Sequence, residues 1–406
     1  MQNKKLALAT TSLLTLFTYQ YAQAAAFQLY ELGTPIVGMA DVGQAAYAID
    51  ASTAYFNPAA MTQLSTSGFL LGTQLILPYA NFSSSSRSTI SGDNGGNAGS
   101  LTPGVDMFYV YHYSPRMSFG VSLTTPYAGA LNYTDSWKGR YVIQSMQYYT
   151  ININPVIGYQ INQYLSIGGG IAAEYANLNQ RVALRVTSTN DAQANIKVDN
   201  YSGGVNLGAL ITPRPSTKIG IAYRSKVVHN LTGTTSFTEI NYVPNTTSRL
   251  VMPHNFIISA TQDLSDRFTL LGELGWANWA TMKNTIVAID GFTANTPRDW
   301  RNTYRLGIAG QYTLNDAWLI HAGTSYDSSP TTAAYRLPDL PMDRQIRIGA
   351  GFVYSVLKAA DLGISYEYVN LGKANINNNS AYGALVGSYS RNYMNVLQAS
   401  ININFA

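Results

Sequence analysis

The strongest constraint on this chain is an alternation of apolar and polar residues with period two, repeated along most of its length. In residues 344–354 the even positions are mostly apolar and the odd positions polar or small, and residues 304–312 and 393–405 repeat the pattern. Successive side chains of a β-strand point to opposite faces, so each segment predicts a strand with one apolar face. Counting such segments gives about fourteen strands, an even number as in single-chain bacterial barrels. They are expected near 67–80, 104–115, 117–133, 140–161, 164–189, 200–213, 217–235, 250–263, 267–289, 300–314, 316–329, 344–357, 360–376 and 391–406.

Composition helps to separate a soluble β-protein from a membrane barrel. Charged residues make up only 11% of the chain, against about 25% in an average soluble domain. The absence of Cys excludes disulfide scaffolds, thiol chemistry and Cys-ligated zinc, and a net charge of +4 indicates no nucleic-acid partner. The 46% of apolar residues excludes disorder, and Tyr supplies 30 of the aromatic residues. This composition is typical of a transmembrane β-barrel.

The distribution of aromatic and charged residues favours an apolar face that contacts lipid over one buried in a soluble β-sandwich. Aromatic residues gather at strand ends, as in Tyr304 with Tyr312 and Trp318 with Tyr326, which is typical of the girdles at membrane interfaces. An open sheet edge in lipid would leave backbone groups unpaired, so the sheet must close. We therefore predict an all-β fold, a closed antiparallel transmembrane β-barrel over residues 67–406.

The first residues have the three regions of an export signal in the usual order. Lys4 and Lys5 precede a mostly apolar stretch, and Ala22-Gln23-Ala24 offers a cleavage site, so residues 1–24 are predicted to be a signal peptide. Export of a barrel predicts the outer membrane of a Gram-negative cell, with lipid and lipopolysaccharide around it. We expect the barrel assembly machinery to be a partner, with Phe405 as the terminal aromatic residue used in assembly.

Residues 25–66 do not alternate. They are rich in Ala and Gly and contain Asn57-Pro58-Ala59 near their end. A barrel of about fourteen strands would hold water unless something filled it, so we predict that this segment forms a hatch, a plug inside the lumen. The alternative is a loose periplasmic extension.

Several motifs together resemble the long-chain fatty acid transporter family of outer-membrane proteins (the FadL family, with its TodX-like relatives). They are Ala26-Phe27-Gln28-Leu29, Asp50-Ala51-Ser52-Thr53, Asn57-Pro58-Ala59, the segments 222–227 and 276–279, and the segment 322–330, followed by Pro338, Pro341 and Asp343-Arg344. The resemblance implies a monomeric fourteen-stranded barrel with an N-terminal hatch that takes up hydrophobic molecules. Long-chain fatty acids are the expected cargo, and aromatic or other neutral hydrocarbons are the alternative. It further implies lateral diffusion of the cargo through a gap in the wall, made by a kink in the third strand.

The third strand contains residues that disturb strand pairing. Pro126 cannot donate a hydrogen bond to a sheet, and Gly129, beyond Tyr127, permits a sharp bend. We predict that Pro126, Tyr127 and Gly129 form the kink at the lateral gap. The alternative is an ordinary bulge near the rim.

Arginine residues are the candidates for contacts with a ligand head group. Fatty-acid members of the family place a basic pair in the deep pocket, and the nearest candidates here are Arg181 and Arg298, although neither falls in register with that pair. If a paired cation is absent, neutral hydrocarbons become the favoured cargo. Arg224, Lys226 and Arg347 are expected to face the lumen and to pair with acidic residues such as Glu174, Glu273 or Glu367.

Functions of other classes find little support. The four histidines, His112, His229, His254 and His321, lie on separate predicted strands without a recognisable nucleophile signature or metal-ligand spacing. We therefore expect no enzyme activity, no metal and no cofactor, against the alternative of an outer-membrane hydrolase. A general porin or adhesin is the other alternative, and a porin would lack a hatch.

Overall fold

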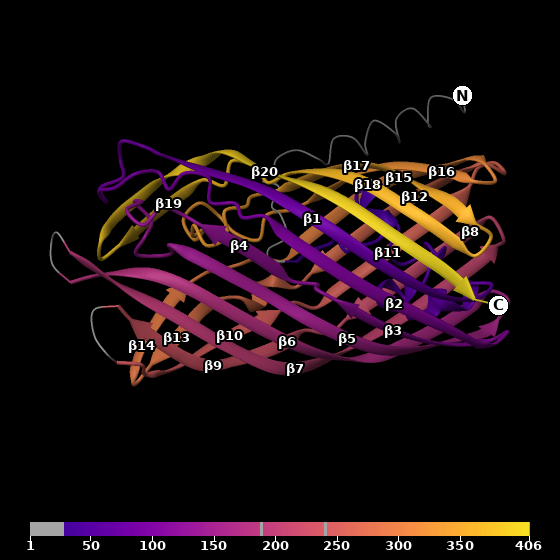
Figure 1. The fold of residues 1–406 in the computed structure, drawn as a ribbon, viewed down its shortest axis with the longest axis horizontal. Coiled ribbons are helices and arrows are strands. Elements are labelled where there is room, and N and C mark those ends of the chain that lie inside the picture. The colour runs from indigo at the N-terminus through magenta and orange to yellow at the C-terminus, as the bar shows by residue number, and fades with distance from the viewer. Residues whose placement is uncertain (1–27, 187–189, 239–241, 406) are drawn as a thin grey trace, which may run out of the picture.

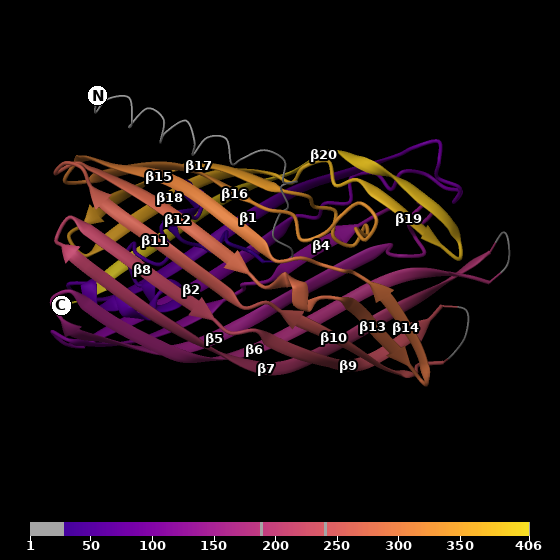
Figure 2. The ribbon, with the colours of Figure 1, turned by 180° about the vertical axis from the view of Figure 1, so that it is seen from behind.

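The computed structural model describes residues 28–186, 190–238 and 242–405, so the predicted signal peptide and its cleavage site lie outside the described residues. Every ladder that joins two strands is antiparallel, and together the ladders link all the strands in one sheet. The first and last strands pair with each other, from Ser67 opposite Phe405 to Ser84 opposite Gly387. This pairing closes the sheet into a barrel (Figures 1 and 2).

Fourteen passes of the chain build the wall, as the alternation predicts. Twenty strand segments form these passes, because six passes are each split into two segments. The segments are β1 (Ser67–Ser84), β2 (Thr102–Ser114), β3 (Met117–Thr124), β4 (Ala128–Asn132), β5 (Ser145–Asn162), β6 (Leu165–Arg185), β7 (Asp191–Arg214), β8 (Thr217–Arg224), β9 (Val227–Phe237), β10 (Asn245–Met252), β11 (Asn255–Asp263), β12 (Phe268–Ala277), β13 (Asn284–Ile289), β14 (Phe292–Pro297), β15 (Thr303–Asn315), β16 (Trp318–Asp327), β17 (Gln345–Leu357), β18 (Ala360–Asn370), β19 (Ile376–Ser380) and β20 (Gly383–Phe405).

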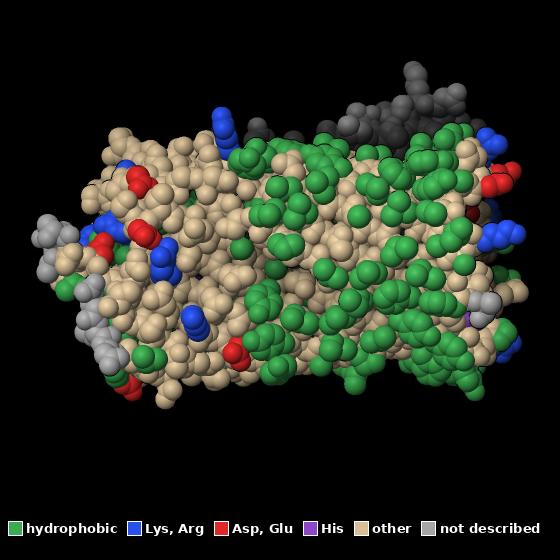
Figure 3. Space-filling view, in the orientation of Figure 1, with side chains coloured by type: hydrophobic (Ala, Val, Ile, Leu, Met, Phe, Trp, Pro, Cys, Tyr) green, Lys and Arg blue, Asp and Glu red, His purple; other side chains and the backbone are tan. Residues whose placement is uncertain are grey.

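The outer surface carries the apolar faces of the strands. Hydrophobic side chains cover the part of the wall toward the C-terminal end of β20, and the opposite end is mostly polar (Figure 3). Residues such as Ile153, Leu274 and Leu306 leave 50%, 58% and 60% of their surface exposed, which suits contact with lipid and not with water. No helix among the described residues is long and apolar enough to cross a membrane.

Rows of aromatic rings mark the limits of this apolar surface. Tyr149, Tyr175 and Tyr201 contact one another across β5, β6 and β7. Beyond this row the apolar residues of β7 change to the inner face, where Ala192, Ala194, Ile196 and Val198 are buried, and the outer face is polar. β7 therefore begins at Asp191, well before the predicted residue 200. A prediction that follows an apolar outer face misses this part of the strand, because its outer face is polar.

The hatch fills the lumen and contains three short helices, η1 (Pro35–Met39), α2 (Thr53–Phe56) and η2 (Pro58–Gln63). A fourth short helix, η3 (Trp279–Thr281), follows β12 in the wall. η1 packs against β15 to β18 and β20, and η2 packs against β3 and β5 to β7 on another side of the barrel. Contacts with strands around the wall place residues 28–66 inside it, as predicted.

Candidate functional site: an apolar pocket beside a break in the wall

The third pass of the wall is broken between β3 and β4. Thr124 pairs with Asn152 of β5, and Ala128 pairs with Tyr149, so four steps along the third pass match three steps along β5. The third pass therefore carries one extra residue, as in a β-bulge, and Pro126 lies within it. The break between β3 and β4 lies beside Pro126, Tyr127 and Gly129, whose role at a lateral gap stays a prediction (Figure 1).

The break leaves part of the wall without a ladder. β2 pairs with β3 only as far as Met107 opposite Leu123, whereas β4 pairs with β5 on its other side. Among the described residues no strand ladder joins the start of β2, residues 102–106, to β4. The beginning of the hatch lies here instead, because the amide of Leu29 donates to the carbonyl oxygen of Pro126 over 2.9 Å.

Asp106 of β2 joins the hatch to the break. Its carboxylate is fully buried and accepts hydrogen bonds from the amide of Thr125, at 3.0 Å, and from the amide of Gly33 in the hatch, at 2.8 Å. Gly33 lies against Gly72, the partner of Asp106 on β1, where a Cβ atom would come within 1.5 Å of the Gly33 oxygen. One carboxylate therefore holds hatch, wall and broken strand together.

An apolar pocket lies beside this break. Its lining comes from the start of the hatch, from β1, β2, β4 and β5, from the segment between β16 and β17, and from the neighbouring parts of β17 to β20. The lining residues are Gln28, Leu29, Ile76, Pro78, Tyr79, Ala80, Thr102, Ala128, Gly129, Ala130, Leu131, Met146, Asp339, Leu340, Pro341, Met342, Gln345, Arg347, Leu371, Asn392 and Met394. The pocket thus includes residues from both sides of the break, and an apolar lining with few polar groups is typical of a site for hydrophobic ligands.

The predicted hatch motif is seated on three glycines of the wall. Gly158, Gly168 and Gly208 are paired in register across β5, β6 and β7. A Cβ atom on Gly208 would lie 1.9 Å from the Asn57 Oδ1 atom, and one on Gly168 would lie 2.6 Å from the backbone of Ala59. The absence of side chains here allows the backbones of hatch and wall to touch.

Asn57 also fixes the hatch by hydrogen bonds. Its side-chain amide donates to the carbonyl oxygens of Ala45, within the hatch, and of Ala209, on β7, over 2.6 and 3.0 Å. Its Oδ1 atom accepts from the amide of Ala59, just after Pro58, and so caps the first turn of η2. The Asn-Pro-Ala motif therefore anchors the hatch to the wall.

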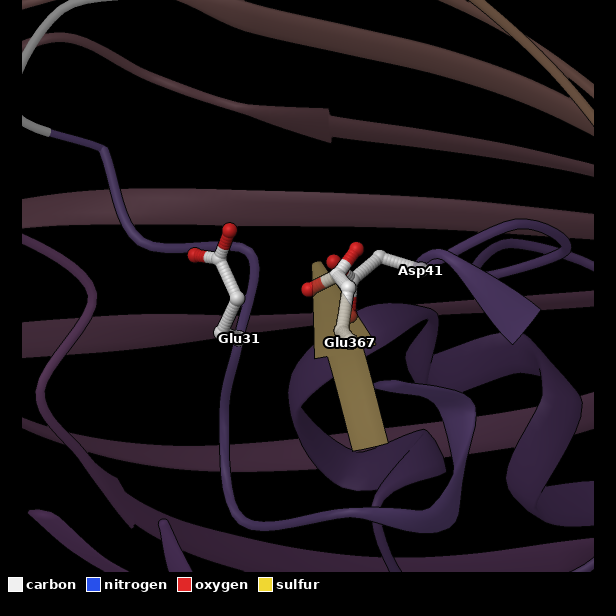
Figure 4. Close-up of side chains that lie close together, drawn as sticks. All are labelled: Glu31, Asp41 and Glu367. Atoms are coloured by element: carbon white, nitrogen blue, oxygen red, sulfur yellow. The ribbon is translucent and has the colours of Figure 1, made fainter. Parts of the chain in front are cut away.

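Buried charges form a second junction between hatch and wall. Glu31 and Asp41 of the hatch approach Glu367 of β18, as Figure 4 shows, with carboxylate oxygens within 4.8 Å of one another. The Arg347 guanidinium contacts all three, at 2.9 Å from Glu31, 3.9 Å from Asp41 and 3.7 Å from Glu367, and also contacts Asp327. Carboxylates thus outnumber the cation among these groups.

Burial compensates part of this excess. Together with the neighbouring Glu31 carboxylate, it raises the pKa of the Asp41 side chain, in the hatch, to about 8. The raised pKa favours the neutral, protonated form of Asp41, which reduces the excess of negative charge in the cluster. The cluster is best described as an ion-pair network around Arg347, a grouping that residue spacing in the sequence did not reveal.

The two predicted head-group arginines are not brought together. Arg181 pairs at 2.8 Å with Asp135, which is largely exposed. Arg298 lies next to the pocket, and its guanidinium bonds to both carboxylate oxygens of Asp339, one of them at 2.8 Å. Neither arginine contributes to the lining of the pocket itself.

Of the three cations expected to face the lumen and pair with acidic residues, only one does so. Arg347 pairs with Glu367, as predicted, whereas Arg224 donates to the carbonyl oxygen of Tyr55 in the hatch. Lys226 is exposed, because it lies between β8 and β9, where this pass is interrupted. Glu174 pairs with His229 at 3.0 Å instead.

Comparison with known proteins shows the family. Residues 15–405 match the family model of outer membrane protein transport proteins (OMPP1/FadL/TodX). The chain belongs to this family. The FadL/TodX family membership makes it an outer-membrane transporter of hydrophobic compounds.

Individual FadL/TodX relatives agree in sequence and fold. The chain is 24% identical to the long-chain fatty acid transport protein of Escherichia coli K12, over 87% of this chain and 90% of that protein. It is also 24% identical to a putative outer membrane protein of Neisseria meningitidis, over 88% and 89%. The fold is similar to a Pseudomonas aeruginosa FadL homologue (TM-score 0.86, 20% identity, 94% and 100% coverage) and to the Ralstonia pickettii toluene transporter TbuX (TM-score 0.72, 17% identity, 93% and 100% coverage).

Proposed function

We propose that this protein takes up hydrophobic molecules from outside the cell and releases them sideways into the outer membrane through the break between β2 and β4. The observation that carries the proposal is the position of the apolar pocket, whose lining includes Thr102 on one side of the break and Ala128 to Leu131 on the other. Cargo in this pocket would lie next to the gap in the described wall where the start of β2 has no ladder to β4.

Hydration energetics favour a lateral exit. Each CH2 group kept out of water stabilises the cargo by about 0.8 kcal/mol, so release through a watery lumen would be unfavourable for a long apolar molecule. The lumen is also filled by the hatch and by its buried ion pairs around Arg347. The route through the wall avoids both obstacles.

The start of the hatch would have to move for cargo to pass. At the start of the hatch, the amide of Leu29 donates a hydrogen bond to the carbonyl oxygen of Pro126, and the amide of Gly33 donates one to the Asp106 carboxylate. These few hydrogen bonds close the break. The Asn57-Pro58-Ala59 motif, near the end of the hatch, rests on the glycines of β5 to β7. We propose that only the start of the hatch moves when cargo leaves.

Two classes of cargo are the candidates, long-chain fatty acids and aromatic hydrocarbons. The sequence resemblance favours long-chain fatty acids, and the relatives with solved structures include a toluene transporter, which favours aromatic hydrocarbons. The lining of the pocket is apolar enough for either class.

Removal of the extra residue in the third pass tests the proposal. Deletion of Pro126 would let β3 and β4 pair with β5 as one continuous strand, whereas Pro126→Ala keeps the extra residue and the break. We expect the deletion to lower uptake of labelled oleate and toluene about tenfold or more, by cells that lack their own family members. Heat-modifiable migration on gels checks that each variant is folded. Equal uptake by the deletion variant, or no uptake of either probe by the parent chain, would contradict the proposal.

A further inference from the structure

The charged groups at the pocket suggest which cargo class it accepts. Asp339 and Arg347 are the only charged residues in the lining, counted over the described part of the chain. Gln28, Gln345 and Asn392 are among the few polar ones. A ligand carboxylate would need a cation with free hydrogen-bonding capacity, so the partners of the nearby arginines decide the matter.

Arg298, the arginine directly behind Asp339, is already neutralised. Its side chain and that of Asp339 are only 9% and 7% exposed, and the pair is bidentate. Its Nε–H donates to the Thr285 hydroxyl at 2.8 Å. A ligand carboxylate approaching Arg298 would have to compete with Asp339 and would meet its negative charge first, because Asp339 and not Arg298 lines the pocket.

Arg347 offers no alternative anchor. It contacts Glu31, Asp327 and Glu367 and is closed off on one face by the Tyr30 ring, 4.9 Å from the guanidinium carbon. Its guanidinium is already shared among these carboxylates, so a ligand carboxylate would have to compete with them for it. Other lumen arginines are also occupied, since Arg305 contacts both Glu273 and Asp327.

We infer that the pocket selects uncharged hydrophobic molecules over carboxylates of the same length, and that Asp339 is the residue that determines this specificity by masking Arg298. The inference rests on the proposed function, since it concerns the cargo of the same pocket. It includes hydrocarbons and esters, whose apolar groups need no counter-ion, and it disfavours ionised fatty acids.

The test compares two probes that differ only in the head group. Equilibrium binding of labelled palmitate and methyl palmitate to the purified full chain is measured at about pH 9, where the acid is ionised. We expect the unmodified chain to bind the ester at least about tenfold more tightly than the acid. In Asp339→Asn, Arg298 loses its counter-charge while the shape of the side chain is kept, so the ratio of the two affinities should fall about tenfold.

Two controls make the result specific. Asp135→Asn removes the carboxylate partner of Arg181, the same chemical change outside the pocket, and should leave the ratio as in the parent chain. The double variant Asp339→Asn with Arg298→Gln should restore the preference for the ester. If Asp339→Asn does not fold, the parent chain alone gives a test, because acid binding should strengthen as the pH falls and the probe becomes neutral.

The outcomes separate this inference from the proposed function. Equal binding of acid and ester by the parent chain would overturn the inference but support a hydrophobic pocket. An unchanged ratio in Asp339→Asn would overturn the role of Asp339. Binding of neither probe would contradict the proposed function itself.

Discussion

At the scale of single residues, Asp106 is the most informative position, because one carboxylate accepts from both the hatch and the broken strand. In Asp106→Asn the side chain keeps its shape but one of the two amides would face an NH2 group. Hydrogen bonds to charged groups contribute about 1.5–3 kcal/mol, so we expect amide exchange at Gly33 and Thr125 to accelerate about tenfold or more. Hydrogen–deuterium exchange of the protein in detergent measures this.

A matched variant controls for the loss of charge. Asp361 of β18 accepts from Ser355 at 2.7 Å, away from the break, and Asp361→Asn should leave exchange at Gly33 and Thr125 as it was. Unaltered exchange in Asp106→Asn would show that Asp106 does not hold the hatch to the break.

Residues that shape the break and the pocket could be predicted from the sequence only where their effect does not depend on a distant partner. Pro126 by itself indicates a break, because proline has no backbone N–H group to donate to a neighbouring strand. Asp106 and Asp339 gave no such signal, because Gly33 and Arg298 lie 73 and 41 residues away from them and meet them only once the barrel has closed. Arg298 was identified as a cation, but its masking depends on that distant Asp339.

At the scale of elements, the seat of the hatch on β5 to β7 can be tested by a side chain added to its glycines. Gly208→Val would push a Cβ atom against Asn57, and overpacking of this kind costs about 1–3 kcal/mol. We expect the hatch to shift, so that proteolysis of residues 28–66 becomes faster while the barrel stays folded. Gly272→Val is the control, because a Cβ atom there meets nothing within 4 Å. Equal proteolysis of both variants would contradict the proposed seat.

Elements were predictable to different degrees. Strands in the membrane follow from apolar alternation, and all fourteen passes were found this way. Beyond the tyrosine row, residues 191–199 of β7 still alternate, but their apolar residues lie on the inner face and their polar residues on the outer face. A search for apolar outer faces therefore misses where this strand begins. The hatch was recognised by the absence of alternation, but its seating on β-strand glycines needs the three-dimensional register.

At the scale of the whole molecule, closure of the barrel and occupation of the lumen were both predictable, because the membrane allows no open edge and a wide barrel needs a plug. The position of the pocket was not, since its lining comes from eight strands or loops and the hatch together. Lateral release requires that cargo pass from this pocket into the surrounding lipid.

Photolabelling in lipid nanodiscs tests that claim most directly. A hydrophobic diazirine probe, activated in the presence of the full chain, should form adducts with Thr102 and with residues 128–131 on the two sides of the break, and should also label lipid. Adducts confined to the hatch and to the lumen-facing side of the wall, with none at the break, would show that cargo leaves along the barrel axis and would contradict a lateral exit.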